Sequence, residues 1–405
     1  MSHNDEVLPY PLGYDTALEP PKEWARLRGQ CPMATIELPS GDHATMLTRH
    51  EDIKTLLTDS RFARPTAADN AARIAPEGSG GGVATGDSTM AIPDEGEPHR
   101  RWRRMVGKYF TAKRMAALRP SMTVTTEHLI DDMVRKGAPA DLKADVGFPL
   151  PVYVICDMLG VPADDRHRFS RWSDMLLSVT RYSREETRAS MGEFTQYMSA
   201  HIAAKRADQT DDLIGMLVRE SEGEGQGMSD AELLTTAMGL LVAGHETTAN
   251  AIGKMVAMLL ADRTRWERLL ADPSLVRTAV EESLRFDVNH GFGLRRYLPE
   301  ETEIGGQALP AGTTVVCAIA SANRDENVFD HADQMDLGRT PNPHLAFSAG
   351  PHSCLGQALA RTEMQVALET LLRRLPTLEL AVPAEELRRV EGLLVGGLQE
   401  VPVRW

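Results

Sequence analysis

Apolar residues recur every three or four positions along most of this chain, which is the spacing of an amphipathic helix. The segments with this spacing are 51–58, 99–262, 275–286 and 355–374. Glycine, proline and polar residues interrupt the second of these segments at 137–139, 149–151 and 221–229. The pattern predicts a protein that consists mainly of helices.

The longest uninterrupted helical pattern covers residues 230–262. Ser229 precedes it and Glu232 follows three positions later, which is the capping box that begins many helices. Because no proline lies within the segment, we expect one helix of roughly 50 Å at ~1.5 Å per residue. Such a helix would cross the whole molecule.

Strand-like patterns are short and lie toward the two ends of the chain. They are 34–38, 44–47, 303–304, 308–309 and 313–320, followed by strands and turns within 377–405. The first two flank the turn residues Pro39–Asp42, which predicts a β-hairpin. We therefore expect a mainly α fold with small β-sheets.

The organisation of the chain favours one domain, although 405 residues would usually form two or three. No linker or internal repeat divides the sequence, so we expect residues 1–405 to form a single domain. Its β-rich part would comprise about 30–50, 295–320 and 377–405, and its helical part about 51–290 and 355–374. Residues 63–98 are rich in Gly, Ala, Pro, Asp and Ser and predict a long loop, which is often functional.

Composition and charge exclude several classes of protein. Acidic residues outnumber basic ones, 58 to 44, and the net charge of -14 argues against a general nucleic-acid binder. No signal-peptide pattern and no apolar run of about 18 residues occurs, so we expect no membrane-spanning segment and a cytoplasmic protein. The four cysteines lie far apart, which favours a reducing compartment over a disulfide framework.

The segment 347–356, FSAGPHSCLG, carries the strongest local signal. Cys354 lies just before a predicted long helix, whose unpaired amides and dipole favour thiolate over thiol. A thiolate binds iron and favours O–O cleavage. Gly350 permits a tight turn, Gly356 would let the helix approach a flat macrocycle, and Phe347 would shield the sulfur. A buried structural cysteine is the alternative for Cys354 alone, but the spacing Phe-x-x-Gly-x-His-x-Cys-x-Gly weighs against it.

This spacing resembles the haem-binding loop of the cytochrome P-450 family. One departure is Ser348, where many members carry glycine. The resemblance implies the cytochrome P-450 fold, with haem b (iron protoporphyrin IX) buried between the long central helix and the helix that follows the cysteine loop. It implies that Cys354 is the thiolate ligand to the iron and that His352 contacts a haem propionate.

A second motif, Ala243-Gly-His-Glu-Thr-Thr248, lies near the middle of the long helix. Glycine and threonine are poor choices there, but the Thr247 hydroxyl can bond the carbonyl of Ala243. Gly244 leaves room for a diatomic ligand, and Glu246 beside Thr247 offers a route for protons. A packing glycine with two tolerated threonines is the alternative. Next to the cysteine loop, the motif resembles the family's acid–alcohol pair.

Charged pairs at helical spacing match two further family motifs. Glu282 and Arg285 lie at i and i+3, and resemble the family's structural Glu-x-x-Arg pair, which Arg339 would join. His99 and Arg103 lie at i and i+4 and resemble its propionate clamp. Arg296 would complete the clamp with His352, although the neighbouring Arg295 leaves the register open by one residue. Each of these residues alone would be an ordinary solvated charge.

The resemblance implies a monooxygenase that activates dioxygen at a haem-thiolate iron and oxidises, most simply by hydroxylation, a small organic substrate such as a specialised metabolite. The residues expected to contact substrate are Leu240, Asn289, His290, Phe292, Leu394 and Val395. Oxidative coupling or epoxidation on the same scaffold is one alternative, and a haem-thiolate sensor or binding protein without turnover is another.

Electrons must come from another protein, because the sequence has no flavin or iron–sulfur motif. We expect a ferredoxin and a ferredoxin reductase as donors, and a monomeric enzyme. A basic run could form a docking patch for an acidic ferredoxin, with an ordinary solvated helix face as the alternative. It comprises Arg100, Arg101, Arg104, Lys108 and Arg114.

Overall fold

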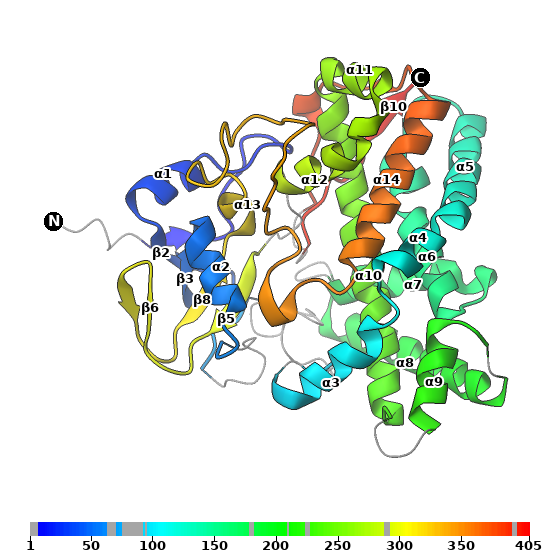
Figure 1. The fold of residues 1–405 in the computed structure, drawn as a ribbon, viewed down its shortest axis with the longest axis horizontal. Coiled ribbons are helices and arrows are strands. Elements are labelled where there is room, and N and C mark those ends of the chain that lie inside the picture. The colour runs from blue at the N-terminus through cyan, green and yellow to red at the C-terminus, as the bar shows by residue number, and fades with distance from the viewer. Residues whose placement is uncertain are drawn as a thin grey trace.

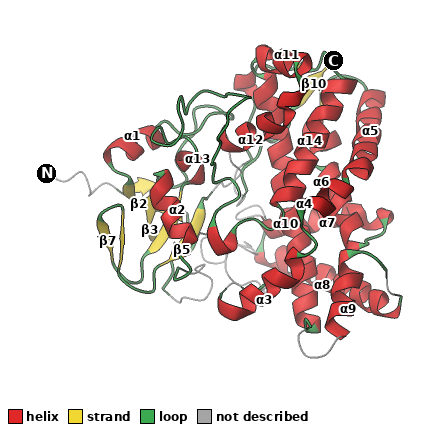
Figure 2. Cartoon of the chain, in the orientation of Figure 1, coloured by secondary structure: helices red, strands yellow, loops and turns green. Residues whose placement is uncertain are grey.

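Most of the long helices lie on one side of the molecule and the main β-sheet, with a few short helices, lies on the other, as the ribbon in Figure 1 shows. The structure is a computed structural model. It describes residues 7–62, 70–74, 92–93, 95–177, 182–208, 210–222, 227–286, 292–390 and 395–405. The cartoon in Figure 2 shows the same division, with the helices in red and the strands in yellow.

The long helix α10, Asp230–Leu260, runs through the helical side. Ser229 and Glu232 form the expected capping box, in which the serine hydroxyl accepts from the Glu232 amide and the carboxylate accepts from the Ser229 amide. Helices α6 (Pro149–Leu159) and α14 (Gln357–Arg374) pack against α10. Most of α10 is buried as a result, so tertiary packing adds to the local signals that begin the helix.

The remaining helices surround α10 or cover the sheet. They are α1 Glu23–Gln30, α2 His50–Thr58, α3 Gly96–Gly107, α4 Ala112–Ala117, α5 Arg119–Lys136, α7 Arg166–Leu177, α8 Arg184–Ala207, α9 Leu213–Glu222, α11 Arg263–Ala271, α12 Val276–Phe286 and α13 Ile319–Ala322. The expected break at 137–139 is confirmed by Gly137, which ends α5 with a positive φ of 93°. The break expected at 149–151 is wrong, because Pro149 begins α6, where its missing N–H costs no hydrogen bond.

Five short strands form the main sheet in the order β1-β2-β3-β8-β5. Their bounds are β1 Leu8–Pro9, β2 Met33–Glu37, β3 His43–Leu47, β8 Thr314–Cys317 and β5 Leu294–Tyr297. Strands β2 and β3 are the predicted hairpin, with Ile36 opposite Ala44. The strand run expected at 313–320 ends early, because α13 begins at Ile319.

Two smaller sheets complete the β structure. Strands β6 (Thr302–Ile304) and β7 (Gln307–Leu309) form a hairpin at the predicted places. Strand β10 (Pro402–Arg404) lies between β9 (Glu379–Leu380) and β4 (Ala140–Asp141). The pairing with β4 was not expected, since β4 lies within the region predicted to be helical.

The largest hydrophobic core lies among the helices and includes much of α10, and two smaller clusters pack against the main sheet. Among the described residues, no helix is both long enough and apolar enough to span a membrane.

Candidate active site

A cavity of about 440 Å³ lies between α10 and the loop that leads into α14. Its volume falls within the range of about 300–1,000 Å³ found for ligand and cofactor pockets. The expected site residues that line it are His99, Arg103, Leu240, Ala243, Gly244, Thr247, Phe347, His352, Cys354, Gly356 and Val395. Apolar side chains that were not expected, among them Trp102, Ile155 and Leu294, form much of the remaining wall.

The loop that carries Cys354 closes on itself through backbone bonds. The amide of Cys354 donates to the carbonyl of Phe347 at 2.8 Å. Ser348 and Gly350 have positive φ angles of 61° and 69°, so the serine adopts a conformation that favours glycine. A Cβ at Gly350 would lie 2.7 Å from the Cα of Thr58, at the end of α2. Gly350 is therefore required both by its own backbone and by its neighbour.

The side chain of Cys354 is exposed, and it lines the cavity. Because protein surrounds the sulfur on its other sides, burial raises the pKa of the Cys354 thiol. The amide of Gly356 and the charges of Arg103 and Arg361 lower that pKa, but they do not outweigh burial. The Gly356 amide at the helix start thus acts in the direction expected from the sequence, and burial acts in the opposite direction.

Basic side chains from α3 and from the cysteine loop gather at one edge of the cavity. His99 is buried, and its ring stacks on the ring of His352 with centroids 4.5 Å apart. Arg103 follows one turn later in α3, and partial burial lowers the pKa of its guanidinium. No carboxylate in the part of the chain that the structure describes pairs with Arg103. This edge therefore suits an anionic group.

The two neighbouring arginines Arg295 and Arg296 lie on opposite faces of strand β5, because side chains alternate along a strand. Arg295 donates from Nη1 to the carbonyl of Ala72 at 3.1 Å, and burial lowers its pKa. Arg296 is buried, and it lies on the same strand face as Leu294 because side chains alternate along a strand. Leu294 lines the cavity, so the geometry favours Arg296 for the basic edge, although Arg296 itself is not on the wall.

The middle of α10 presents Ala243 and Thr247 to the cavity. The Thr247 hydroxyl donates to the carbonyl of Ala243 at 3.0 Å, as expected. Gly244 lines the cavity and also packs on α6, because an added Cβ would lie 3.1 Å from Cγ1 of Ile155. This glycine therefore packs on α6 and also borders the cavity.

Glu246 does not line the cavity with Thr247. Its carboxylate is buried and accepts from Nδ2 of Asn250 at 3.1 Å. The ring of His245, also buried, lies on the same side, with Nε2 3.8 Å from the carboxylate. His245 thus belongs to a buried network and not to the solvent. Asn250 was missed by sequence reasoning, although its position four residues after Glu246 was a usable signal.

Glu282, Arg285 and Arg339 meet in a buried cluster. Arg285 donates through Nε and Nη2 to the two oxygens of Glu282, each at 2.8 Å, and both side chains are fully buried. Arg339 adds a bond from Nε to Glu282 at 3.1 Å. Arg285 also donates to the carbonyls of Asn323 and Ala332. The cluster thereby ties α12 to the long loop that precedes Cys354.

Comparisons with known proteins decide the family. The family model described as Cytochrome P450 matches residues 167–385. Nocardicin C N-oxygenase of Nocardia uniformis subsp. tsuyamanensis is 41% identical over 399 residues, which is 98% of each chain. The chain belongs to the cytochrome P450 family. Mycinamicin IV hydroxylase/epoxidase of Micromonospora griseorubida is 39% identical over 398 residues, again 98% of each chain. The structure of the LnmA cytochrome P450 hydroxylase from Streptomyces atroolivaceus S-140 matches with a TM-score of 0.90 and 38% identity, over 98% of this chain and 100% of that chain.

This cytochrome P450 is accordingly a haem-thiolate monooxygenase, which uses dioxygen and an organic substrate and receives electrons from a redox partner. Its cofactor is haem with a cysteine thiolate ligand. The residues around the cavity fit that group. The thiol of Cys354 faces the cavity, Arg103 supplies a cation without a carboxylate partner among the described residues, and a Cβ at Gly356 would meet no protein atom within 4 Å.

The residues expected to contact substrate divide into three groups. Leu240 and Val395 line the cavity of this P450. Phe292 does not, because its buried ring packs on Tyr10 beside the main sheet, with centroids 6.3 Å apart. The remaining three, Asn289, His290 and Leu394, lie outside the described residues.

The basic run on and after α3 is largely compensated within the chain. Arg100 and Arg104 both bond Glu97, Arg101 bonds Glu232, and Lys108 bonds Glu220. Arg114 lies over the ring of Tyr109 at 4.8 Å. This surface of the P450 therefore carries less free positive charge than its sequence indicates.

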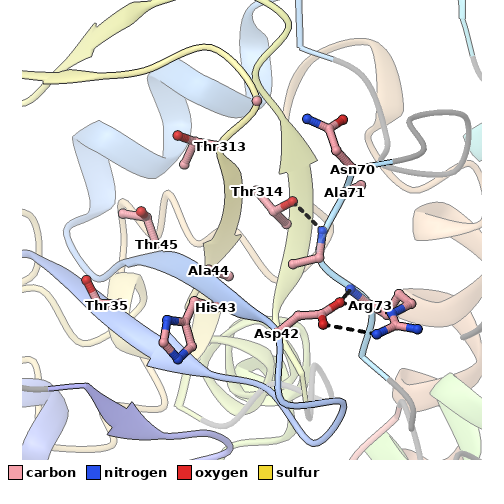
Figure 3. A pocket seen from close by; sticks show the side chains of 12 residues that line it. Thr35, Asp42, His43, Ala44, Thr45, Asn70, Ala71, Arg73, Thr313 and Thr314 are labelled. Carbon is pink, nitrogen blue, oxygen red and sulfur yellow. Dashed lines mark hydrogen bonds and ion pairs between the residues drawn. The ribbon is translucent and has the colours of Figure 1, made fainter. Parts of the chain in front are cut away.

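A second hollow, of about 540 Å³, lies on the main sheet and is lined by residues of β2, β3, β8 and the segment 70–73 (Figure 3). Asp42 accepts from Nε of Arg73 at 3.0 Å, and the amide of Ala72 donates to Thr314 at 2.8 Å. These bonds attach the segment to the sheet. None of the site residues expected from the sequence lines this hollow.

Proposed function

We propose that this P450 hydroxylates a small specialised metabolite at a haem whose iron is bound by Cys354. The observation that carries the proposal is that one cavity brings together the Cys354 thiol, a basic edge and the glycine–threonine face of α10. Bound haem supplies the activation of dioxygen and the insertion of oxygen. The chain supplies ligation, anion binding, protons and the shape of the pocket.

The basic edge is the proposed site of the two haem propionates. His99, Arg103 and His352 would hold them, with Arg296 behind, because a partly buried cation such as Arg103 is stabilised by an opposite charge. Phe347, Gly350 and Gly356 would shape the loop beside the sulfur, and Glu282, Arg285 and Arg339 would hold that loop from behind.

Proton delivery is the proposed role of the α10 motif. Thr247 lies on the cavity wall, where its hydroxyl can exchange the Ala243 carbonyl for a group bound in the cavity. Glu246 is held by Asn250 at 3.1 Å, and this bond fixes its carboxylate in the buried position from which we propose that it supplies protons to Thr247. Gly244 would keep the space beside them open.

The substrate class follows from the relatives. One relative is named an N-oxygenase of nocardicin C and another a hydroxylase/epoxidase of mycinamicin IV. We propose a specialised metabolite of similar size for this chain, contacted by Leu240 and Val395 in the mainly apolar pocket. Asn289, His290 and Leu394 stay predictions for this contact. Because the second relative is also named an epoxidase, epoxidation is the alternative outcome on the same scaffold.

A ferredoxin, reduced by a ferredoxin reductase, is the proposed electron donor, since the sequence lacks a flavin or iron–sulfur motif. The enzyme is proposed to be a cytoplasmic monomer with residues 1–405 in one domain.

The ligand assignment is tested by the carbon monoxide difference spectrum of the reduced protein. The wild type and Cys31→Ser, in which the serine keeps the bond from residue 31 to the carbonyl of Met33, should both show the band typical of thiolate ligation. Cys354→Ser should lose it. A normal band in Cys354→Ser would refute the assignment.

The proton route is tested by the fraction of reducing equivalents recovered in product. Thr247→Ala should divert most of them to hydrogen peroxide, while substrate binding, followed by the Soret shift, stays within about a factor of three. Thr247→Ser, which restores the hydroxyl, should recover coupling. Equal coupling in Thr247→Ala and the wild type would refute this role.

A further inference from the structure

Glu281, next to the Glu282 cluster in sequence, belongs to a different network. Its carboxylate accepts from Nε2 of His344 at 3.0 Å and from Nε of Arg361 at 2.7 Å. Burial alone would raise the pKa of Glu281, but these two bonds outweigh burial and lower it to about 2. The carboxylate is therefore ionised at all working pH values, and it joins α12 to the segment before the cysteine loop and to α14.

Arg361 and His344 both contact Phe347. The guanidinium of Arg361 lies over the ring of Phe347, 4.4 Å from its centroid, and its Nη1 also donates to Oε1 of Gln357 at 3.0 Å. The ring of His344 lies 6.0 Å from that of Phe347, and its Nδ1 accepts from the amide of Ala346 at 3.3 Å. With Nε2 donating to Glu281 and Nδ1 accepting, one tautomer of His344 satisfies both bonds.

Phe347 is in turn coupled to Cys354. The amide of Cys354 donates to the carbonyl of Phe347 at 2.8 Å, and both residues line the cavity. Arg361 is one of the two side chains whose positive charge acts on the sulfur of Cys354. The carboxylate of Glu281 thus fixes a cation that lies over the Phe347 ring and whose charge acts on the Cys354 sulfur.

We propose that Glu281, His344 and Arg361 form a positioning unit that holds the ring of Phe347 beside the Cys354 sulfur and raises the reduction potential of the haem iron. This inference rests on the proposed function, since Cys354 must be the iron ligand. The physical basis is twofold. A guanidinium over an aromatic face attracts the ring, which restricts the positions that the ring can take. A fixed positive charge near the sulfur favours the reduced iron, which carries one positive charge fewer.

The test separates the charge of Arg361 from its shape. Arg361→Met keeps an apolar stem against Phe347 but removes the charge, and Arg361→Lys keeps the charge. The matched control is Arg373→Met on the same helix, whose partner Glu127 lies on α5. All variants are purified with haem, and their reduction potentials, carbon monoxide spectra and thermal unfolding are measured without substrate.

The potential should fall in Arg361→Met, stay closer to wild type in Arg361→Lys and be unchanged in Arg373→Met. If Arg361→Met does not retain haem, the neutral variant Arg361→Gln gives the same comparison. A normal carbon monoxide band with an unchanged potential in the neutral variant would refute the positioning unit and leave the proposed function intact. An abnormal band in the wild type itself would refute the proposed function instead.

Discussion

Two glycines of the cysteine loop offer a matched pair of substitutions with opposite expected effects. In Gly350→Ala the added methyl enters a crowded place, because it would meet the carbonyl of Leu57 and lie 2.7 Å from the Cα of Thr58. In Gly356→Ala the added methyl meets no protein atom within 4 Å, and the residue lines the cavity. The first variant perturbs the protein, and the second perturbs only what the cavity holds.

The magnitudes follow from the backbone and the contacts. Gly350 has a φ of 69°, and a residue with a Cβ pays about 1–2 kcal/mol in that region. Overpacking against α2 adds about 1–3 kcal/mol. The free energy of unfolding should therefore fall by about 2–5 kcal/mol in Gly350→Ala. Gly356 has an ordinary φ of -83°, so the haem-free Gly356→Ala protein should stay within about 0.5 kcal/mol of wild type.

The assay is urea unfolding of the haem-free proteins, followed by circular dichroism, together with titration of each protein with haem. Gly350→Ala should unfold at lower urea. Gly356→Ala should unfold like the wild type but bind haem at least ten-fold more weakly, because its methyl occupies space that the macrocycle needs. Equal urea midpoints for Gly350→Ala and the wild type would refute the predicted clash with α2. Undiminished haem affinity in Gly356→Ala would refute the close approach of the macrocycle to residue 356.

Three further substitutions test buried groups. Arg285→Met leaves the carboxylate of Glu282 without its bidentate partner, so the haem-free protein should lose about 3–5 kcal/mol in urea unfolding; a loss below 1 kcal/mol would contradict this. Burial raises the pKa of Glu363 well above 4.5, which makes the wild type lose stability as pH rises past 4.5. Glu363→Gln should therefore have a higher Tm than wild type at pH 7 and an equal Tm at pH 4, and equal values at both would contradict this. Asn250→Leu frees Glu246 and should lower coupling without changing the Soret shift by substrate; unchanged coupling would contradict this.

The sequence was sufficient for features whose causes are local. The start of α10 follows from the capping box of Ser229 and Glu232, and the bond from Thr247 to Ala243 follows from helical spacing alone. The hairpin of β2 and β3 follows from alternation and a turn. In each case the partners lie within about a dozen residues, so the interaction can be read from the order of the chain.

Other features depend on what a residue meets from elsewhere in the fold. Phe292 was expected at the substrate because it follows α12, but its ring packs on Tyr10, far away in sequence. Glu246 was expected beside Thr247, yet Asn250 holds its carboxylate on another side of α10. The thiol of Cys354 shows the same limit. The helix start predicts that a backbone amide lowers the pKa of this thiol, but the larger effect is burial, which raises the pKa and is set by tertiary packing.

The arginines of α3 show why the number of charges in a sequence segment is a poor guide to a binding site. A charge without a partner in the fold is a better guide. By sequence, Arg100, Arg101 and Arg104 look like a docking surface, whereas only its spacing from His99 and the resemblance to the propionate clamp distinguish Arg103. In the structure the first three bond Glu97 or Glu232, and Arg103 is the one α3 arginine with no carboxylate partner among the described residues. A partly buried cation in that state is costly unless an anion completes it. The cavity beside Arg103 offers a place for that anion, and the haem propionates are the anion that we propose.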